Sequence, residues 1–248
     1  MLTEERYNAI LQEMEARGAV TVQELCDSLK ISESTVRRDL INLDKQGKLI
    51  KVRGGATRVG GRFLPDEPDV PTKQRLHMAE KDRIARYAAA QIDDSDFIYI
   101  DAGTTTERMI DYIESSRATF VTNGIVHARK LIQKGCKAYI VGGEIKLSTQ
   151  AVVGALASGM LRQYNFTKAF LGVNGISVSR GFTTPDPEEA LLKTEACRQA
   201  FVSFILADSS KFGMVSAVTF LGLDKACILT DRVPEEKYRK AATIKEIL

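Results

Sequence analysis

The fold of the amino-terminal region is decided by the stretch TVQELCDSLKISESTVRRDLIN, which runs from Thr21 to Asn42. Apolar residues recur at helical spacing in both halves of it, which predicts two short helices separated by a tight turn at residues 30–32. Ser32 is suited to cap the second helix, because its hydroxyl can accept a hydrogen bond from a backbone N–H of the first turn. This spacing is typical of a helix-turn-helix. The apolar positions are Val22, Leu25 and Leu29 in the first helix and Val36, Leu40 and Leu43 in the second.

The second helix of this pair places polar residues opposite its apolar stripe or flanking that outer side, at about 100° per residue. Arg can donate two hydrogen bonds to guanine, hydroxyl groups can donate or accept, and Lys neutralises phosphate, so such a face suits the major groove of DNA. A solvated helix face would carry the same residue types, and the helix taken alone leaves both readings open. The residues concerned are Ser34, Thr35, Arg37, Arg38 and Lys45.

The segment that follows, QGKLIKVRGGA at residues 46–56, predicts a small β-hairpin in which apolar residues alternate with basic ones. Residues 30–62 carry nine Lys or Arg and three Asp or Glu, a net charge of +6, whereas residues 1–29 carry two basic and six acidic side chains, a net charge of −4. Positive potential is therefore concentrated on the second helix and the hairpin, where DNA phosphates would lie. Lys51 and Arg53 of the hairpin join the predicted DNA-binding residues.

Three segments make this sequence resemble the DeoR family of bacterial transcription regulators. They are TEERYNAILQEME near the start, SESTVRRDL in the second helix and KLIKVRGGA in the hairpin, and the resemblance continues over nearly the whole chain. The hairpin is then the wing of a winged helix-turn-helix DNA-binding domain, for which we predict residues 1–58. Residues 3–17 are expected to form its first helix, with Tyr7, Ile10, Leu11 and Met14 at core spacing.

The composition of the chain, 44% hydrophobic and 27% charged over 248 residues, is that of an ordinary globular protein. No apolar run approaches the ~18 residues of a membrane-spanning helix, and residues 1–5 lack the features of a signal peptide, so we expect a cytoplasmic protein with no membrane partner. The four cysteines have no metal-type spacing and are expected to be reduced, buried thiols. His77 and His127 are isolated in the sequence, and no role is assigned to either.

Residues 59–74 are predicted to be a linker, because the composition changes to GGRFLPDEPDVPT at residues 60–72 and the three prolines disfavour a continuous helix. Residues 73–91 predict a helix that leads into a second domain, residues 75–248. Short apolar runs then alternate with helical segments, which predicts an α/β domain with a mainly parallel sheet. The predicted strands are 97–101, 119–123, 137–142, 168–174, 201–208 and 226–231.

Five of these strands end in polar or glycine-rich residues, and ligands of open α/β sheets bind beyond the carboxyl ends of the strands. The most informative end is DAGTTTERM, residues 101–109, because a glycine and three hydroxyl residues at a helix start offer N–H and O–H donors to a phosphate. Thr104 acting only as a helix cap would explain the same pattern. There is no P-loop pattern and no G-x-G-x-x-G, so no nucleotide or other cofactor is predicted.

The family resemblance adds a specific expectation for this domain. The second domain of DeoR regulators is similar to sugar-phosphate isomerases of the ribose-5-phosphate type, and it senses phosphorylated sugars or related metabolites. The resemblance implies that the loop from Gly103 to Thr106 holds the phosphate, and it supplies further candidates for the sugar and the remaining phosphate oxygens. The effector-binding residues so predicted are Asp101, Gly103, Thr104, Thr105, Thr106, Asn123, Gly143, Asn174, Lys193 and Lys211.

A departure from the isomerases argues against catalysis. Those enzymes carry acidic residues just after the fourth strand, whereas this chain has GVNGI at residues 172–176, and the amide of Asn174 cannot act as a general base. Glu188 and Glu189 are adjacent on a predicted helix and diverge by ~100°, so we expect surface or hinge charges rather than a catalytic pair. No catalytic residue and no metal ligand is predicted.

These observations predict a DNA-binding regulator, a repressor of a sugar-metabolism operon, whose operator binding is modulated by a phosphorylated sugar. We expect a homo-oligomer, a dimer or a tetramer, because one recognition helix reads few base pairs and paired half-sites supply the specificity. One alternative is a sugar-phosphate isomerase-like enzyme with a fused DNA-binding module. Another is a global activator or architectural DNA binder without a ligand, which would leave the polar strand ends unexplained.

Overall fold

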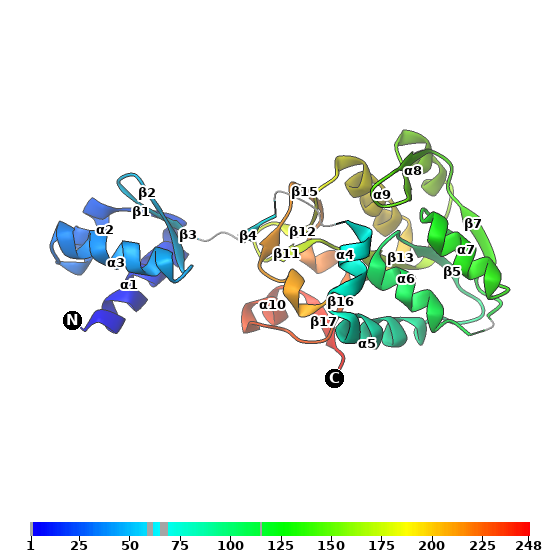
Figure 1. Cartoon of the computed structure of the whole chain (residues 1–248), viewed down its shortest axis with the longest axis horizontal. Helices are drawn as coiled ribbons and strands as arrows, with labels where there is room; N and C mark the ends of the chain where they lie inside the picture. The colour runs from blue at the N-terminus through cyan, green and yellow to red at the C-terminus, as the bar shows by residue number, and fades with distance from the viewer. Residues whose placement is uncertain (1, 59–61, 65–68, 115) are drawn as a thin grey trace. The chain divides into compact units, whose positions relative to one another are not determined.

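The computed structural model describes residues 2–58, 62–64, 69–114 and 116–248, and the chain forms two compact units, residues 1–62 and 63–248 (Figure 1). The division falls inside the segment 59–74 that the sequence predicts as a linker. Residues 59–61 and 65–68 of that segment lie outside the described residues.

The first unit contains the helix-turn-helix that the sequence predicts. Lys30 has a left-handed φ of 53° between its two helices, and Ser32 caps the second helix by accepting a hydrogen bond from the N–H of Thr35 at 3.4 Å. All six residues of the predicted apolar stripe lie in or against one core, together with Ile10 and Met14 of the first helix. The helices are α1 (Thr3–Arg17), α2 (Val22–Leu29) and α3 (Glu33–Lys45).

The predicted wing is an antiparallel hairpin of β2 (Leu49–Val52) and β3 (Gly55–Arg58). A short strand that the sequence did not reveal, β1 (Ala19–Thr21), pairs with the other side of β3 and gives the order β1-β3-β2. Because β1 leads directly into α2, the wing is fixed to the helical core. The structure thus confirms a winged helix-turn-helix.

The helix predicted at residues 73–91 is interrupted, and that prediction was wrong in this respect. The structure has α4 (Val70–Arg75) and α5 (Met78–Ala89), separated by Leu76 and by His77, whose φ is 52°. Apolar spacing gives no signal for a single left-handed residue. The short α4 is compatible with the prolines around it, because Asp69 caps it and its proline stands in the first turn, where a missing N–H costs nothing.

The second unit is built on a seven-stranded sheet in the order β17-β16-β13-β10-β5-β6-β7, and every strand pair is parallel. Each of the six predicted strands is present, which confirms the α/β class; the edge strand β17 was not predicted. The strands are β5 (Phe97–Ile100), β6 (Thr119–Thr122), β7 (Lys137–Ile140), β10 (Phe166–Gly172), β13 (Ala200–Leu206), β16 (Cys227–Thr230) and β17 (Thr243–Glu246).

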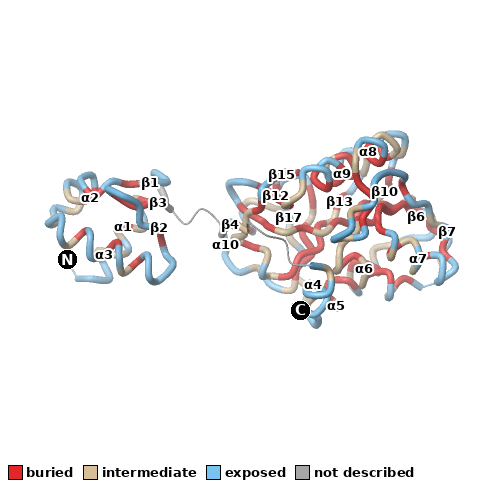
Figure 2. The backbone as a smooth tube through the Cα atoms, turned by 45° about the horizontal axis from the view of Figure 1, so that its top comes forward, coloured by how far each residue is buried: buried red, intermediate tan, exposed pale blue. Residues whose placement is uncertain are grey.

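Helices cover both faces of this sheet, so that its central strands are buried between two layers (Figure 2). On one face, α5, α6 (Thr104–Asp111) and α7 (Ile125–Gln133) pack Ile84, Met109 and Leu131 against the strands. On the other face, α8 (Ala155–Leu161), α9 (Pro187–Arg198) and α10 (Glu236–Ala241) contribute to a second core.

Smaller elements lie outside the parallel sheet. They add a hairpin, a three-stranded sheet, a short strand pair and two 3-10 turns. These are β8 (Glu144–Lys146) with β9 (Ala151–Val153), then β11 (Gly175–Ser177), β12 (Gly181–Thr184) and β15 (Val218–Leu221), then β4 (Arg62–Phe63) with β14 (Met214–Val215), and finally η1 (Ser209–Lys211) and η2 (Leu223–Lys225). No helix in the described part of the chain has the length and apolar character needed to cross a membrane.

Candidate functional site

The helix α3 presents an exposed polar face with one free arginine. Ser34, Arg37, Arg38 and Lys45 are exposed, and Thr35 is half-buried. Arg37 is held by Glu33 of the preceding turn, with its Nε 2.8 Å from Oε1. Among the described residues Arg38 has no ion-pair or hydrogen-bond partner for its guanidinium. The two neighbouring arginines therefore differ in their freedom to bind a ligand.

The wing continues this basic surface. Lys51 and Arg53 are exposed, and the backbone N–H of Lys51 donates to Asp44 Oδ1 at 3.1 Å, which ties the wing to the end of α3. The side chains of Ile50 and Val52 are also exposed. The predicted DNA-binding residues thus lie on two elements that are fastened to each other.

The orientation of α3 depends on an ion pair that sequence reasoning missed. Asp39 is buried and accepts hydrogen bonds from Nε and Nη2 of Arg6 on α1, at 2.7 and 3.2 Å. This hydrogen bond to Asp39 raises the pKa of Arg6. The sequence did carry a signal for this buried ion pair. Asp39 stands three residues after Val36 and next to Leu40, on the apolar side of the helix.

In the second unit the order of the strands reverses between β5 and β10. The chain runs from β5 through β6 to β7 in one direction and then continues from β10 in the other, and α6 and α9, which follow on either side, cover opposite faces. Such a switch point opens a crevice at the carboxyl ends of the strands. Its two sides meet at glycines, because a Cβ on Gly103 would lie 3.7 Å from the Cα of Gly172.

A buried ion pair lies beside this crevice. Asp101 Oδ2 accepts hydrogen bonds from Lys193 Nζ and from the N–H of Gly172, the latter at 3.1 Å, and Lys193 also donates to the carbonyl of Gly172 at 3.1 Å. Both charged side chains are more than nine-tenths buried, where an unpaired charge would be costly. These two predicted effector residues therefore join β5, β10 and α9 to one another.

The loop into α6 is held by part of the predicted set. The hydroxyl of Thr106 accepts from the N–H of Gly103 at 3.0 Å and donates to the carbonyl of Asp101 at 2.6 Å. The side chain of Asn123 accepts from the N–H of Ala102 at 2.9 Å and donates to the carbonyl of Val152 at 3.3 Å. The side chains of Thr106 and Asn123 thus stabilise the loop by hydrogen bonds to its backbone.

The remaining donors of this loop have no partner in the described part of the chain. The hydroxyls of Thr104 and Thr105 form no hydrogen bond to any of the described residues. Backbone N–H groups in the first turn of a helix have no carbonyl to bind within the helix, and the positive end of the helix dipole lies there. The start of α6 therefore offers hydroxyl and amide donors to an anion.

His127 of α7 contacts the same loop, although the sequence gave no reason to assign it a role. Its Nε2 is 3.1 Å from the carbonyl oxygen of Gly103 and 3.2 Å from Oγ1 of Thr106. Burial lowers the pKa of His127, so the ring is neutral at pH 7 and Nε2 can donate to the carbonyl of Gly103. A side chain at Gly124 would clash with this ring, since a Cβ there would lie 2.4 Å from Nδ1.

A second residue that sequence reasoning missed is Lys81 of α5. Its side chain is buried, and its Nζ donates to the carbonyl of Lys73. Burial lowers the pKa of Lys81 to about 8; the charge of Asp208 opposes this shift, while Lys211 and Arg108 add to it. The sequence did carry a signal, because Lys81 precedes the buried residues Ile84 and Ala85 by three and four positions, on the apolar face of the helix.

Lys211 and Asp208 belong to the turn that follows β13. Asp208 caps η1 by accepting from the N–H of Ser210 at 3.1 Å, and Lys211 at the end of this turn is half-buried. The interaction of both charges with Lys81 places the end of β13 near α5. Lys81 therefore interacts with the cations Lys211 and Arg108 and with the carboxylate of Asp208, and Arg108 is itself paired with Asp82 at 2.6 Å.

Two other predicted residues anchor hairpins. Gly143 has a φ of 155°, and a Cβ there would lie 2.5 Å from the carbonyl oxygen of Val153, so glycine permits the close approach of β8 and β9. Asn174 accepts a hydrogen bond from the hydroxyl of Thr184 at 3.2 Å, across the β11–β12 hairpin.

The expectation of surface or hinge charges holds for only one of the adjacent glutamates. Glu188 is exposed, but Glu189 is buried and accepts hydrogen bonds from Lys146 Nζ at 3.0 Å and from the hydroxyl of Thr149 at 3.1 Å. The prediction was wrong for Glu189 because the β8–β9 hairpin, which the sequence did not indicate, covers this side of α9.

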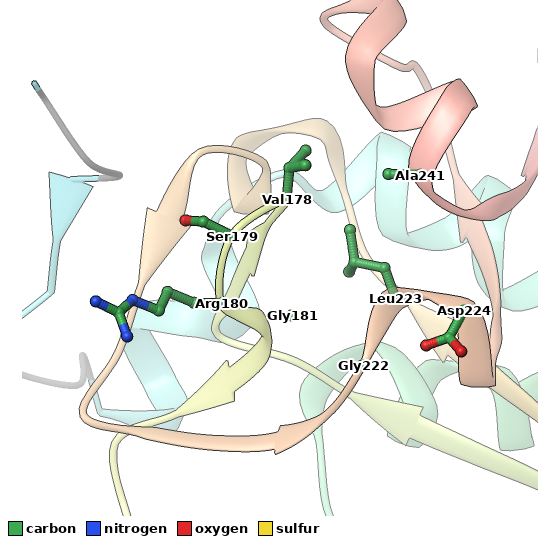
Figure 3. Close-up of a pocket in the computed structure, with 8 residues that line it drawn as sticks. All are labelled: Val178, Ser179, Arg180, Gly181, Gly222, Leu223, Asp224 and Ala241. Atoms are coloured by element: carbon green, nitrogen blue, oxygen red, sulfur yellow. The ribbon is translucent and has the colours of Figure 1, made fainter. Parts of the chain in front are cut away.

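A separate hollow with a volume of about 360 Å³ lies between the β11–β12 turn and the segment at residues 222–224 (Figure 3). Val178, Leu223 and Ala241 line it, and the guanidinium of Arg180 extends away from Leu223. None of the predicted effector residues lines this hollow. The donors at the start of α6 favour the switch point as the effector site.

Comparison with known families covers both units. The DeoR-like helix-turn-helix domain matches residues 6–60, and the DeoR C terminal sensor domain matches residues 76–232. The chain belongs to the DeoR family. This confirms the resemblance drawn from the sequence, and with it a transcriptional regulator rather than an enzyme.

Individual relatives are similar to this chain over nearly their whole length. This DeoR-family chain is 41% identical to the HTH-type transcriptional regulator FruR of Bacillus subtilis (strain 168), over 100% of the chain and 99% of that protein. It is 31% identical to the lactose phosphotransferase system repressor of Staphylococcus aureus (strain N315), over 98% of both. A solved structure of ribose 5-phosphate isomerase A from Methanocaldococcus jannaschii matches 53% of each chain with 14% identity and a TM-score of 0.40.

Proposed function

We propose that this DeoR-family regulator represses a sugar-metabolism operon and that a phosphorylated sugar bound at the switch point of the second unit modulates its operator binding. One observation carries the proposal. Unpaired hydroxyl and amide donors at the start of α6 lie in a sensor domain that also holds a buried lysine of lowered pKa. A sensor built in this way favours an anion as its guest, and its relatives include a repressor of a sugar transport system.

The free donors at the start of α6 suggest that the predicted effector residues have two different roles. Thr104, Thr105 and the first N–H groups of α6 bind the phosphate, with Lys81 and Lys211 compensating its charge. A phosphate carries about two negative charges at neutral pH, which the two lysines would offset. The other residues hold the loop or border the sugar: Asp101, Gly103, Thr106, Asn123, Gly143, Asn174 and Lys193.

On the DNA side, α3 enters the major groove of the operator and the wing contacts phosphates. Arg38, which has no partner among the described residues, reads a base edge, while Ser34, Thr35, Arg37, Lys45, Lys51 and Arg53 position the helix. Two copies of the chain bind two half-sites, because one helix reads too few base pairs to select an operator. The protein therefore works as a homo-oligomer.

The energetic requirement on the effector is modest. A hundredfold change in operator affinity needs a coupling free energy of about 2.7 kcal/mol. Charge-assisted hydrogen bonds to a desolvated phosphate contribute about 1.5–3 kcal/mol each. One bound phosphate that favours one arrangement of the protein can therefore supply the coupling.

The proposal is tested with the full-length protein in two measurements. Fluorescence anisotropy with DNA from upstream of the chain's own gene should show tight, salt-dependent binding. A thermal-shift panel of phosphorylated sugars, repeated with the matching unphosphorylated sugars, should show stabilisation by phosphorylated compounds only, and the stabilising compound should change the anisotropy. Absence of DNA binding at low salt, or equal stabilisation by the unphosphorylated sugars, would contradict the proposal.

A further inference from the structure

The outer edge of β7 is open. β7 ends the parallel sheet on one side, and within the described part of the chain no strand pairs with its outer edge. The N–H of Val141 donates to the carbonyl of Thr122 on β6 at 3.0 Å. Because successive residues of a strand turn their N–H and C=O groups to opposite edges, Ala138 and Ile140 present theirs outward.

This edge is also unusually apolar. Tyr139 and Ile140 of β7 are 45% and 43% exposed, on opposite faces of the strand, and the neighbouring Ile132 of α7 is 61% exposed. The β8–β9 hairpin, which follows β7 in the sequence, also carries exposed apolar residues, Ile145 and Leu147, at 58% and 93%. Contiguous exposed apolar groups at an unpaired strand are a site of association unless charges protect them.

The opposite edge of the same sheet is protected in that manner. β17 has the sequence TIKE, in which Lys245 and Glu246 follow Ile244, and it keeps no large aliphatic residue in the exposed class. β7 carries one charged residue, Lys137 at its start, with its Nζ 5.7 Å from the centroid of the Tyr139 ring, whereas β17 carries two charged residues. The two edges of one sheet therefore differ, and the β7 edge is the more apolar of the two.

We infer that β7 pairs in antiparallel fashion with β7 of a second copy of this chain, about a two-fold axis that passes near Tyr139. In this register Ala138 faces Ile140 of the second copy as a hydrogen-bonded pair on each side of the axis. The two Tyr139 residues face each other as a non-hydrogen-bonded pair, with Cα atoms about 4.5 Å apart. Both sheets then join into one, and the apolar residues of α7 and the β8–β9 hairpin meet around the junction.

Two observations select a second copy over another partner. An antiparallel strand pair about a two-fold axis is self-complementary, which is the requirement of an isologous interface. The strand begins at Lys137 and is followed by Glu144, both exposed, so antiparallel pairing brings the basic end of one strand toward the acidic end of the other. The inference rests on the homo-oligomer of the proposed function and names its surface.

The experiment compares the mass of the full-length chain and two variants by sedimentation equilibrium. Ile140→Glu places two carboxylates in the junction and should reduce the mass from twice to once 27.4 kDa. Phe201→Glu is the matched control, because Phe201 is 83% exposed at the start of β13 and lies outside the proposed interface; it should leave the mass unchanged. Circular dichroism should show the same fold for all three proteins.

A cysteine pair tests the register. In Tyr139→Cys the two thiols would face each other within disulfide distance, so mild oxidation should give a covalent dimer. In Lys137→Cys they would be separated by roughly 13 Å along the strands and should not join, and the wild-type chain is oxidised in parallel. A wild type that stays monomeric would overturn both this inference and the proposed homo-oligomer. An Ile140→Glu variant that stays dimeric, without cross-linking of Tyr139→Cys, would overturn the inference alone.

Discussion

Replacing Lys81 by methionine should weaken effector binding while leaving the unliganded fold intact. Methionine retains much of the length of the lysine side chain and removes a buried charge whose pKa is already lowered to about 8. If Nζ compensates the phosphate, the loss of this charge-assisted interaction costs about 1.5–3 kcal/mol, or roughly a 10- to 150-fold rise in the dissociation constant. Lys240→Met, at an exposed position of α10, is the matched control and should have no effect.

The pKa of Lys81 also predicts how the affinity of the wild-type protein for the effector depends on pH. In the free protein Lys81 loses its proton around pH 8, whereas a bound phosphate dianion would raise that pKa. Binding therefore takes up a proton, and the affinity is lost as the pH rises through 8. With a free-state pKa of about 8 the affinity should fall about tenfold between pH 7 and pH 9, a range in which the phosphate itself stays dianionic.

Isothermal titration calorimetry in two buffers of different ionisation enthalpy measures this proton directly. At pH 8 the wild type should take up about half a proton for each effector bound, and Lys81→Met should take up none. If the variant bound the effector with wild-type affinity and the wild type showed no proton uptake, the phosphate would not lie near Lys81, and the role proposed for this lysine would have to be abandoned.

Three further substitutions test separate parts of the structure. Arg38→Ala should weaken operator binding by about 1–3 kcal/mol and relax sequence preference in anisotropy titrations, more than Arg37→Ala does; equal weakening on random DNA would make Arg38 a phosphate contact. Thr105→Val should leave operator binding intact and reduce the response of a reporter to the effector, and unchanged induction would remove the loop from the site. The lowered pKa of His127 means that the unfolded chain binds a proton first, so the free energy of unfolding should fall as the pH drops below about 6.5. In denaturant titrations His127→Gln should lack this part of the pH dependence, and the exposed His77 replaced by Gln should retain it; an identical slope in both variants would exclude the buried ring as the cause.

The sequence predicted the strands because their apolar runs are continuous and buried, and their polar ends mark one edge of the sheet. It could not predict how the polar residues at that edge divide between ligand and loop. Thr106 and Asn123 have the donors and acceptors that a sugar phosphate needs, but in the structure they bind Gly103, Asp101 and Ala102. Holding a loop and binding a ligand require the same groups, so residue type alone does not separate them.

The functional residues that the sequence did not predict have one property in common. Lys81, His127 and Asp39 are polar residues on the buried faces of helices, and each contacts a residue of another element. Their partners are fixed by packing between elements, which no local pattern describes. A charged or titratable residue at an apolar helical position was nevertheless visible in the sequence for Lys81 and Asp39, and this is the signal to use in related chains.

The helix α9 connects the effector site to the β8–β9 hairpin. Lys193, on one of its turns, binds Asp101 at the switch point, and Asp186 and Glu189, at its start, bind Lys146 of β8 at 2.8 and 3.0 Å. A shift of α9 on effector binding would therefore move the hairpin that follows β7 in the chain. The ion pair of Lys146 is thus a candidate carrier of the coupling free energy.

Lys146→Met should reduce the change in operator affinity that the effector causes, while the affinities for effector alone and for operator alone stay within about twofold of the wild type. Arg162→Met is the matched control, because Arg162 binds Glu195 on α9 at 3.3 Å without involving the hairpin. The coupling is obtained by titrating operator DNA with and without saturating effector for all three proteins. If Lys146→Met kept the full coupling, or if Arg162→Met lost as much, the hairpin would not transmit the signal, and α9 would act on the DNA-binding unit by another route.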